Sequence, residues 1–198
     1  MESMRKIPNS FKRIAIYGAP GSGKSTLAMQ LGKILRMRVI HLDDIFHGPF
    51  WREPSRKIFQ TRVIKLLKNS LWIIDGNYSS VRPLILSKAT LAIILDVPMY
   101  LLAWRIFIRT IGRNTRFKLG STTPLPYQVK KSGAKEQIPA SIFELWSYAL
   151  DFRNKKYHEI RTEAKNSLGN HKVIVLRRKQ EIVYLLNIVK DYVKLAQS

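Results

Sequence analysis

The residue types most suited to chemistry lie together near the start of the chain, in the segment Gly18-Ala-Pro-Gly-Ser-Gly-Lys-Ser25. Its spacing is GxxxxGK[ST], in which glycines let successive backbone N–H groups surround phosphate oxygens. In such a loop the lysine reaches the β- and γ-phosphates and the serine hydroxyl ligates Mg²⁺. We therefore predict a site for ATP and magnesium, with Lys24 as a catalytic residue and Ser25 as a metal ligand. The nucleotide-binding residues would be Gly18, Ala19, Pro20, Gly21, Ser22, Gly23, Lys24, Ser25 and Thr26.

The segments on either side of this loop have the pattern that such a site requires. Arg13–Tyr17 is a short β-branched run, and Lys24–Met37 carries good helix formers with apolar residues at helical spacing. Strand, glycine loop and helix is the order of a P-loop, and the amino end of the helix adds favourable partial charge for an anion. The alternative is a chance glycine turn, which the complete match in this context disfavours.

Acidic residues follow two other apolar runs. Asp43 comes after the predicted strand Arg38–Leu42, where it could position an acceptor hydroxyl, so we predict it as a catalytic and substrate-binding residue. Asp75 comes after the run Leu71–Ile74, the place of a Walker-B carboxylate, and we predict that it supports the magnesium ion. The structural alternatives are a helix N-cap for Asp43 and a type I turn that begins at Asp75.

Neighbouring residues leave more open. Gly76 would let a substrate approach the backbone closely, and we predict it in the substrate site. Asp44 and Asp96 fit a functional and a structural role equally well. His41 fits a satisfied residue at the end of a strand better than a catalytic base.

Arginines recur at helical spacing beyond the fourth apolar run, with no acid between Asp96 and Glu136. Bidentate guanidinium groups neutralise the charge of a phosphoryl group in transfer. We predict that Arg105 binds the nucleotide, that Arg109 is catalytic, and that Arg113 and Arg116 bind substrate. A solvated helix face is the alternative, although such a row would repel itself unless it bound an anion.

The pattern of elements predicts an α/β domain. Its strands would be Arg13–Tyr17, Arg38–Leu42, Leu71–Ile74, Leu91–Leu95 and Lys172–Leu176, and its helices Lys24–Met37, Pro54–Asn69, Met99–Ile111, Ala140–Leu168 and Gln180–Ala196. Continuous apolar strands alternating with helices form a parallel sheet covered on both faces, with ligands at the carboxyl ends of the strands. We expect one domain over 1–198, with a substrate-binding helical region at about 43–70 and a basic lid at about 109–139.

Composition limits the partners of the chain. Lys and Arg number 35 against 13 Asp and Glu, a formal net charge of +22, which favours polyanions such as nucleic acid or phosphorylated molecules. The absence of cysteine excludes disulfides and thiolate metal sites. Residues 1–13 lack the apolar region of a secretory signal, and charges interrupt Leu91–Ile108, so we expect a cytoplasmic protein with no membrane span.

These motifs together resemble the adenylate-kinase-like P-loop NTPases, and among them the topology modulation (FlaR-related) proteins. The resemblance rests on IAIYGAPGSGKSTLA, VIHLDDIFHGPFW, WIIDGNY, IILDVP with LLAWRIFIR, and VIVLRRKQEI, which leaves out Gly112–Pro139. It implies a central P-loop strand, a lid that Arg105 and Arg109 open, and an acceptor-side aspartate at Asp43, as in shikimate-kinase-like enzymes. Adenylate kinases carry Asp-Gly-x-Pro-Arg where this chain has Asp75-Gly-Asn-Tyr-Ser79, without the Pro-Arg.

We conclude from the sequence that the chain is a magnesium-dependent kinase that transfers the γ-phosphate of ATP to a small molecule or nucleotide. One alternative is a nucleic-acid-associated NTPase of the DNA topology modulation type, in which the positive charge contacts a phosphate backbone. Another is an NTP-binding regulatory protein with little turnover, in which Asp43 and Asp75 are structural. The acceptor, the choice between ATP and GTP, and the oligomeric state stay open.

Overall fold

The computed structural model describes residues 8–47, 54–98, 100–102 and 155–196. Its strands are β1 (Arg13–Gly18), β2 (Val39–His41), β3 (Trp72–Asp75), β4 (Leu91–Leu95) and β5 (Val173–Leu176). Its helices are α1 (Lys24–Leu35), α2 (Leu42–His47), α3 (Arg56–Leu67), α4 (Arg82–Leu86), α7 (Tyr157–Leu168) and α8 (Lys179–Leu195), with 3₁₀ turns η1 (Asn9–Phe11) and η3 (Asn170–Lys172). The predicted lid and all four predicted lid arginines, Arg105, Arg109, Arg113 and Arg116, lie outside the described residues.

The strands form a five-stranded sheet in the order β2-β3-β1-β4-β5, and every neighbouring pair is parallel. Strand β1 is therefore the central strand, as the resemblance implied. The predicted fold class, a five-stranded parallel sheet with helices on both faces, is confirmed. All five strands end at the same edge, which is where α/β folds of this kind bind their ligands.

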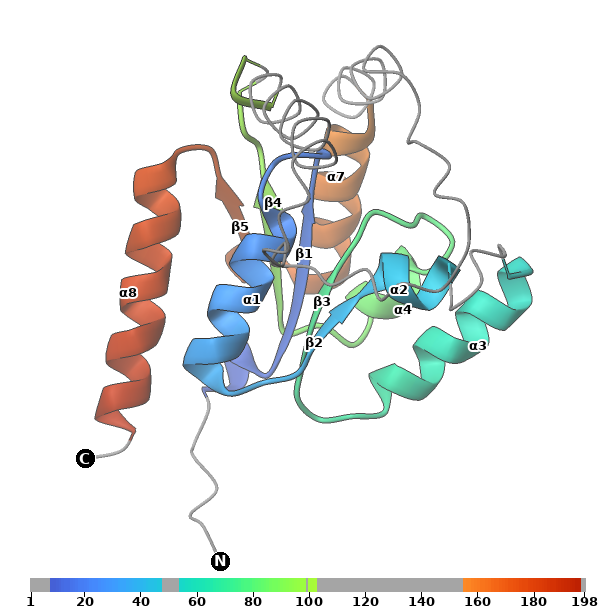
Figure 1. Cartoon of the computed structure of the whole chain (residues 1–198), viewed down its shortest axis with the longest axis horizontal. Coiled ribbons are helices and arrows are strands. Elements are labelled where there is room, and N and C mark those ends of the chain that lie inside the picture. The colour runs from blue at the N-terminus through green and yellow to red at the C-terminus, as the bar shows by residue number, and fades with distance from the viewer. Residues whose placement is uncertain (1–7, 48–53, 99, 103–154, 197–198) are drawn as a thin grey trace, which may run out of the picture.

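Helices cover both faces of this sheet (Figure 1). Helices α1 and α8 pack against each other on one face, and α4 and α7 pack against each other on the opposite face. Helix α3 contacts the short helix α2 near β2, the edge strand. Because both faces are covered, the strands carry continuous apolar side chains, and β4 is buried along its whole length.

Helix α1 follows the P-loop and packs closely on the sheet. Its buried side chains include Leu27, Leu31 and Leu35, at the spacing of a single helix face. Gly32 lies on the same face, and a Cβ atom there would come within 2.5 Å of Val39 Cγ2 in β2. Arg36 ends the helix in the left-handed conformation, with φ of 53°. The packing holds the amino end of α1 at the carboxyl edge of the sheet.

The element bounds differ from the sequence prediction in a few places. Two short helices were not predicted: α2, which begins at Leu42 where a strand was expected to end, and α4. Helix α3 begins after Ser55, whose hydroxyl accepts the N–H of Ile58, rather than at Pro54. Asp75 is the last residue of β3 and not the residue after it. Short helices lack the periodic apolar pattern that reveals long ones.

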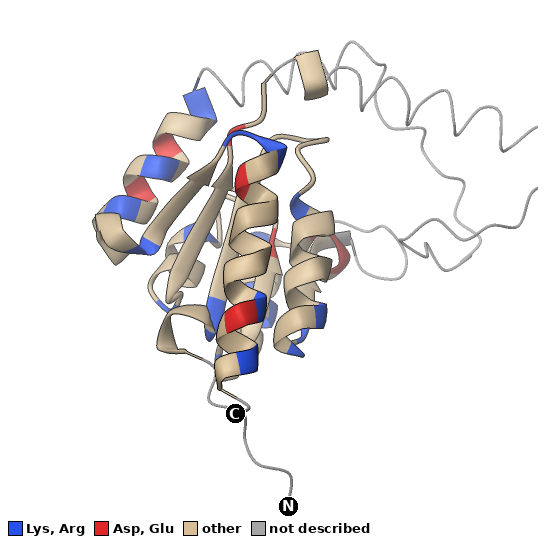
Figure 2. Cartoon of the chain, turned by 90° about the vertical axis from the view of Figure 1, so that its left-hand side faces the viewer, with Lys and Arg blue, Asp and Glu red and all other residues tan. Residues whose placement is uncertain are grey.

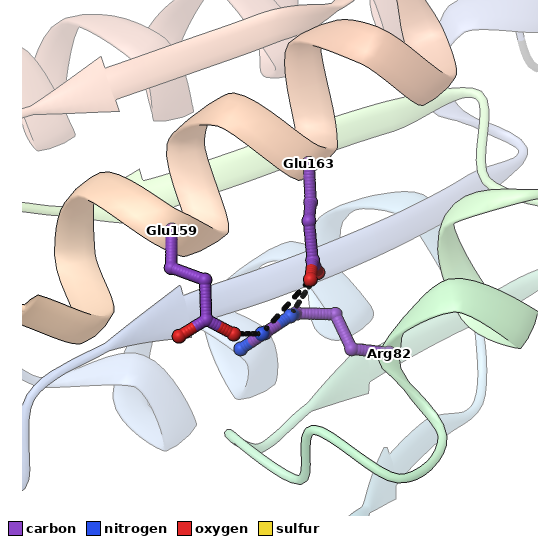
Figure 3. Close-up of polar contacts among 3 residues, drawn as sticks. All are labelled: Arg82, Glu159 and Glu163. Atoms are coloured by element: carbon purple, nitrogen blue, oxygen red, sulfur yellow. Dashed lines mark hydrogen bonds and ion pairs between the residues drawn. The ribbon is translucent and has the colours of Figure 1, made fainter.

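A buried arginine joins the two helices on one face (Figure 3). Arg82 of α4 is only 3% exposed, and its guanidinium contacts the carboxylates of Glu159 and Glu163 on α7. Both carboxylate oxygens of Glu163 contact the guanidinium, and Oε1 lies 3.2 Å from Arg82 Nη2. Glu159 and Glu163 are one helical turn apart, so the guanidinium bridges two carboxylates that would otherwise repel each other and offsets one of their two charges.

Among the described helices, none is long and apolar enough to cross a membrane.

Candidate functional site

The loop between β1 and α1 has the backbone shape that its glycines predict. Gly21 has φ of 77° and Gly23 has φ of 96°, both in the region that favours glycine. Gly18 has φ of 155°, and a Cβ atom there would come within 2.8 Å of Ser22 Oγ and 2.9 Å of Leu95 Cβ. No side chain among the described residues caps the amino end of α1, so the N–H groups of its first turn face this loop.

Two side chains hold the loop in place. Asn77, in the loop after β3, donates to the carbonyl of Gly18 at 2.6 Å and accepts the N–H of Gly18 at 3.3 Å. The Lys24 ammonium donates to the carbonyl of Ala19 at 3.1 Å, so its charge lies over the loop. Both contacts place polar groups around the position where the P-loop pattern expects phosphates.

Ser25 and Asp75, the predicted magnesium residues, are in direct contact. Ser25 Oγ donates to Asp75 Oδ2 at 2.7 Å, across 50 positions of sequence. Asp75 is only 4% exposed, which is unusual for a carboxylate unless it is well paired. Its other oxygen, Oδ1, lies 2.5 Å from His41 Nδ1. One buried carboxylate therefore joins the first helix, the third strand and the second strand.

The sheet register explains the contact between His41 and Asp75. The two residues are register partners in the parallel pair of β2 and β3, so their side chains point to the same face. The hydrogen bond to Asp75 raises the pKa of His41 above its usual value, while partial burial opposes the shift. His41 is thus a satisfied residue at the end of a strand, as predicted, and its partner is a predicted site residue.

Asp43 lies in the first turn of α2, with its side chain exposed. The hydroxyl of Tyr78 donates to Asp43 Oδ1 at 2.8 Å. The Tyr78 ring packs against Phe46 and Phe59, with ring centroids 4.8 Å and 5.1 Å away. The carboxylate is therefore oriented by a tyrosine that α2 and α3 hold in place.

Gly76, a predicted substrate residue, and Asp96, whose role was left open, both have structural contacts. A Cβ atom on Gly76 would come within 2.7 Å of Leu42 Cβ, and φ there is 144°, so local packing alone accounts for a glycine. A contact between Gly76 and a substrate stays a prediction. Asp96 accepts from Arg177 Nε at 3.1 Å, which joins the end of β4 to the loop after β5.

The structure brings most predicted residues of the P-loop side together at one edge of the sheet. Lys24, Ser25 and Thr26 begin α1, and Asp75 and Gly76 end β3 next to them. Asp43 belongs to α2, beyond β2. Arg105, Arg109, Arg113 and Arg116 lie outside the described residues, so their roles stay predictions.

Sequence reasoning did not select Asn77 and Tyr78, which hold Gly18 and Asp43. Both directly follow Asp75-Gly76 at the carboxyl edge of the sheet. The rule that selected Asp75, polar residues directly after a buried strand, could have selected them too. Their partners could not be inferred, because they lie 59 and 35 positions away in sequence.

The described residues fit a magnesium ion that is bound partly through nucleotide phosphates. They hold no cluster of three or more His, Asp or Glu side chains that would form a complete protein cage for a metal. The donors present are the hydroxyl of Ser25 and the carboxylate of Asp75, both hard oxygen ligands. Mg²⁺ is usually held this way, by few protein oxygens together with phosphates and waters.

No protein-family model matches the chain, and no curated protein matches its sequence significantly. Solved structures do match. A shikimate kinase from Bacteroides thetaiotaomicron aligns with a TM-score of 0.53 and 14% identity, over 92% of this chain and 98% of that one. The chain has the fold of shikimate kinase.

Two other kinases align less well with this chain. A gluconokinase from Sinorhizobium meliloti has a TM-score of 0.48 and 14% identity, over 94% of each chain. A shikimate kinase from Acinetobacter baumannii, in complex with shikimate, has a TM-score of 0.47 and 16% identity, over 93% of this chain and 98% of that one.

Proposed function

We propose that the chain is a magnesium-dependent kinase that transfers the γ-phosphate of ATP to a hydroxyl of a small molecule or nucleotide, in the cytoplasm. The observation that carries the proposal is the contact between Ser25 and Asp75, at 2.7 Å, beside a loop with P-loop glycine geometry. A chance glycine turn would not require a buried carboxylate against its serine. The fold supports the same proposal, since it is shared with a shikimate kinase.

Each residue has a part that follows from its place. The loop amides and the Lys24 ammonium bind the phosphates and neutralise their charge. Ser25 would ligate a magnesium ion with support from Asp75, and the ion would supply further neutralisation of the triphosphate. Asp43 accepts the proton of the acceptor hydroxyl, and Tyr78 keeps its carboxylate in position.

The function is tested by a coupled assay for ADP release over a library of metabolites and nucleotides. We expect one class of acceptor to raise the rate of ADP release well above that without acceptor. Lys24→Ala should abolish this activity, and the matched control Lys33→Ala, an exposed residue of the same helix, should retain it. Full activity in Lys24→Ala would overturn the assignment.

Asp43→Asn tests the acceptor side separately. The amide cannot accept the proton, so we expect the rate of transfer to fall by about 100-fold or more while nucleotide binding is unchanged. Asp191→Asn is the matched control, because Asp191 is an exposed aspartate on α8. If only slow hydrolysis is found, and Asp43→Asn leaves it unaltered, the chain is an NTP-binding regulatory protein instead.

A second function is favoured by the charge of +22 and by the acid-free stretch between Asp96 and Glu136. In it the chain is an NTPase associated with nucleic acid, which is the function that the resemblance to topology modulation proteins would suggest. Among the described residues, most Lys and Arg lie on the helices and in the loops next to them (Figure 2), and Arg13 begins strand β1. Binding to duplex DNA that stimulates ATP hydrolysis would favour this function over the kinase.

A further inference from the structure

His41 lies in the site, but the proposed reaction gives it no part. Its imidazole lies 2.5 Å from a carboxylate oxygen of Asp75, at the end of the edge strand β2. An ionised carboxylate only accepts hydrogen bonds, so His41 Nδ1 carries the proton in this contact. Nδ1–H then donates to Asp75 Oδ1 and occupies that oxygen.

The oriented carboxylate of Asp75 in turn orients the hydroxyl of Ser25. With Oδ1 held by His41, the other oxygen, Oδ2, faces α1 and accepts the hydroxyl proton of Ser25 at 2.7 Å. A serine hydroxyl has one proton and two lone pairs. Because its proton is committed to Asp75, both lone pairs of Ser25 Oγ are left for a cation. The two hydrogen bonds, from His41 to Asp75 and from Ser25 to Asp75, therefore orient Ser25 Oγ as a cation ligand before any cation binds.

The sheet makes the arrangement rigid. His41 and Asp75 are register partners, and Asp75 is also the register partner of Ile16 in the central strand. Neighbouring strands thus fix the backbone of Asp75 from both sides, which leaves its two side-chain torsions to be set by the contacts of the carboxylate. The hydrogen bond from His41 to one oxygen restricts these torsions.

We propose that His41 is a positioning residue for magnesium: it holds the Asp75 carboxylate so that Ser25 presents its lone pairs to the metal of a bound magnesium-nucleotide. The inference rests on the proposed nucleotide site but not on the identity of the acceptor. Residues that support metal ligands in this way change metal affinity by about 10- to 100-fold when they are substituted.

The test separates metal binding from nucleotide binding. Calorimetry would measure the affinity of the wild type, His41→Leu and His41→Asn for ADP with magnesium, and for ADP with EDTA. We expect His41→Leu to bind magnesium-ADP about 10- to 100-fold more weakly, with the affinity in EDTA unchanged within about twofold. His41→Asn keeps an N–H donor near the position of Nδ1 and should recover most of the loss. His158→Ala, at an exposed histidine of α7, should match the wild type.

Several results would overturn the inference alone. One is a His41→Leu protein that binds magnesium-ADP as the wild type does. Another is an equal loss of affinity with and without magnesium, which would indicate a structural role. If the wild type binds no nucleotide under either condition, the proposed function falls and this inference with it.

A measurement on the wild type tests the same proposal without depending on variants that fail to fold. Nitrogen NMR of the imidazole should show His41 Nδ1 protonated, with its proton shifted downfield by the short contact to Asp75. The signal should respond to magnesium-ADP and much less to ADP in EDTA. An unprotonated Nδ1, or an equal response to both, would overturn the proposal without any substitution.

Discussion

At the scale of single residues, the site depends on a glycine that has no room for a larger side chain. Gly76 illustrates this, because a Cβ atom there would come within 2.7 Å of Leu42 Cβ while φ is 144°. Leu42 begins the helix that carries Asp43. A change at Gly76 would therefore move the acceptor side relative to Asp75.

We expect Gly76→Ala to lower the free energy of unfolding by about 2–4 kcal/mol, because the methyl group adds both backbone strain and a clash with Leu42. Urea denaturation followed by circular dichroism measures the change. Gly169→Ala is the matched control, since φ there is 82° and the nearest neighbour is the His171 ring at 3.2 Å. Equal losses in the two variants would show that strain alone is responsible.

Tyr17, which precedes the P-loop, gives a pH-dependent prediction. Its side chain is 2% exposed, and its hydroxyl has no hydrogen-bond partner among the described residues. Burial raises the pKa of Tyr17 above its usual value, an effect that the Arg82 charge opposes. The neutral phenol then contributes stability that is fully present below about pH 10 and is lost as the pH rises further.

Tyr17→Phe removes both the unpaired hydroxyl and this pH dependence. At pH 8 we expect the variant to be as stable as the wild type or more stable by about 1 kcal/mol. At pH 11 its advantage should grow by about 1 kcal/mol, because only the wild type must keep a phenol neutral there. Urea denaturation at both pH values checks this, with Tyr184→Phe, an exposed tyrosine, as the control. An advantage that shrinks at pH 11 would contradict the assignment.

At the scale of elements, the pairing of Arg82 with Glu159 and Glu163 joins α4 to α7. The arginine is 3% exposed, whereas the glutamates are 51% and 38% exposed. Removing the arginine leaves two like charges one turn apart, although solvent screens them in part. Helix α7 is the element that returns the chain to the sheet before β5.

We expect Arg82→Met to lower the free energy of unfolding by about 2–3 kcal/mol, less than for a fully buried pair because the carboxylates are partly solvated. Adding Glu163→Gln should recover part of this loss, since it removes the repulsion on α7. Chemical denaturation of the single and double variants measures both effects. Lys88→Met, an exposed residue just after α4, should change little. A double variant less stable than Arg82→Met would contradict this explanation.

The element scale also shows where sequence reasoning succeeds and where it stops. Strands β1, β3 and β4 were predicted because buried parallel strands carry long apolar runs. The position of Asp75 at a strand end followed from the same pattern. The short helix α2 was missed because six residues are too few to show helical periodicity. The contact of His41 with Asp75 depends on strand order, and local sequence does not encode which strands are neighbours.

At the scale of the whole molecule, the charge of +22 predicts attraction to any polyanion. For the kinase function we expect binding to duplex DNA at about 50 mM salt that weakens by more than about 100-fold by about 200 mM. Such binding is sequence-independent and should leave the rate of ADP release unaltered. Fluorescence anisotropy with labelled DNA, paired with the coupled assay, measures both. A rise in ATP turnover with DNA would favour the second function.

The strand order has a consequence for how this protein could diversify. The phosphate loop follows the central strand, whose neighbours on both sides shield it from local opening, whereas Asp43 and the Tyr78 aromatic contacts belong to the border formed by β2, α2 and α3. Amide protons of β1 should therefore exchange only on global unfolding, and those of α2 much sooner. New acceptor preferences can arise through changes at the periphery while the phosphate-handling centre stays intact.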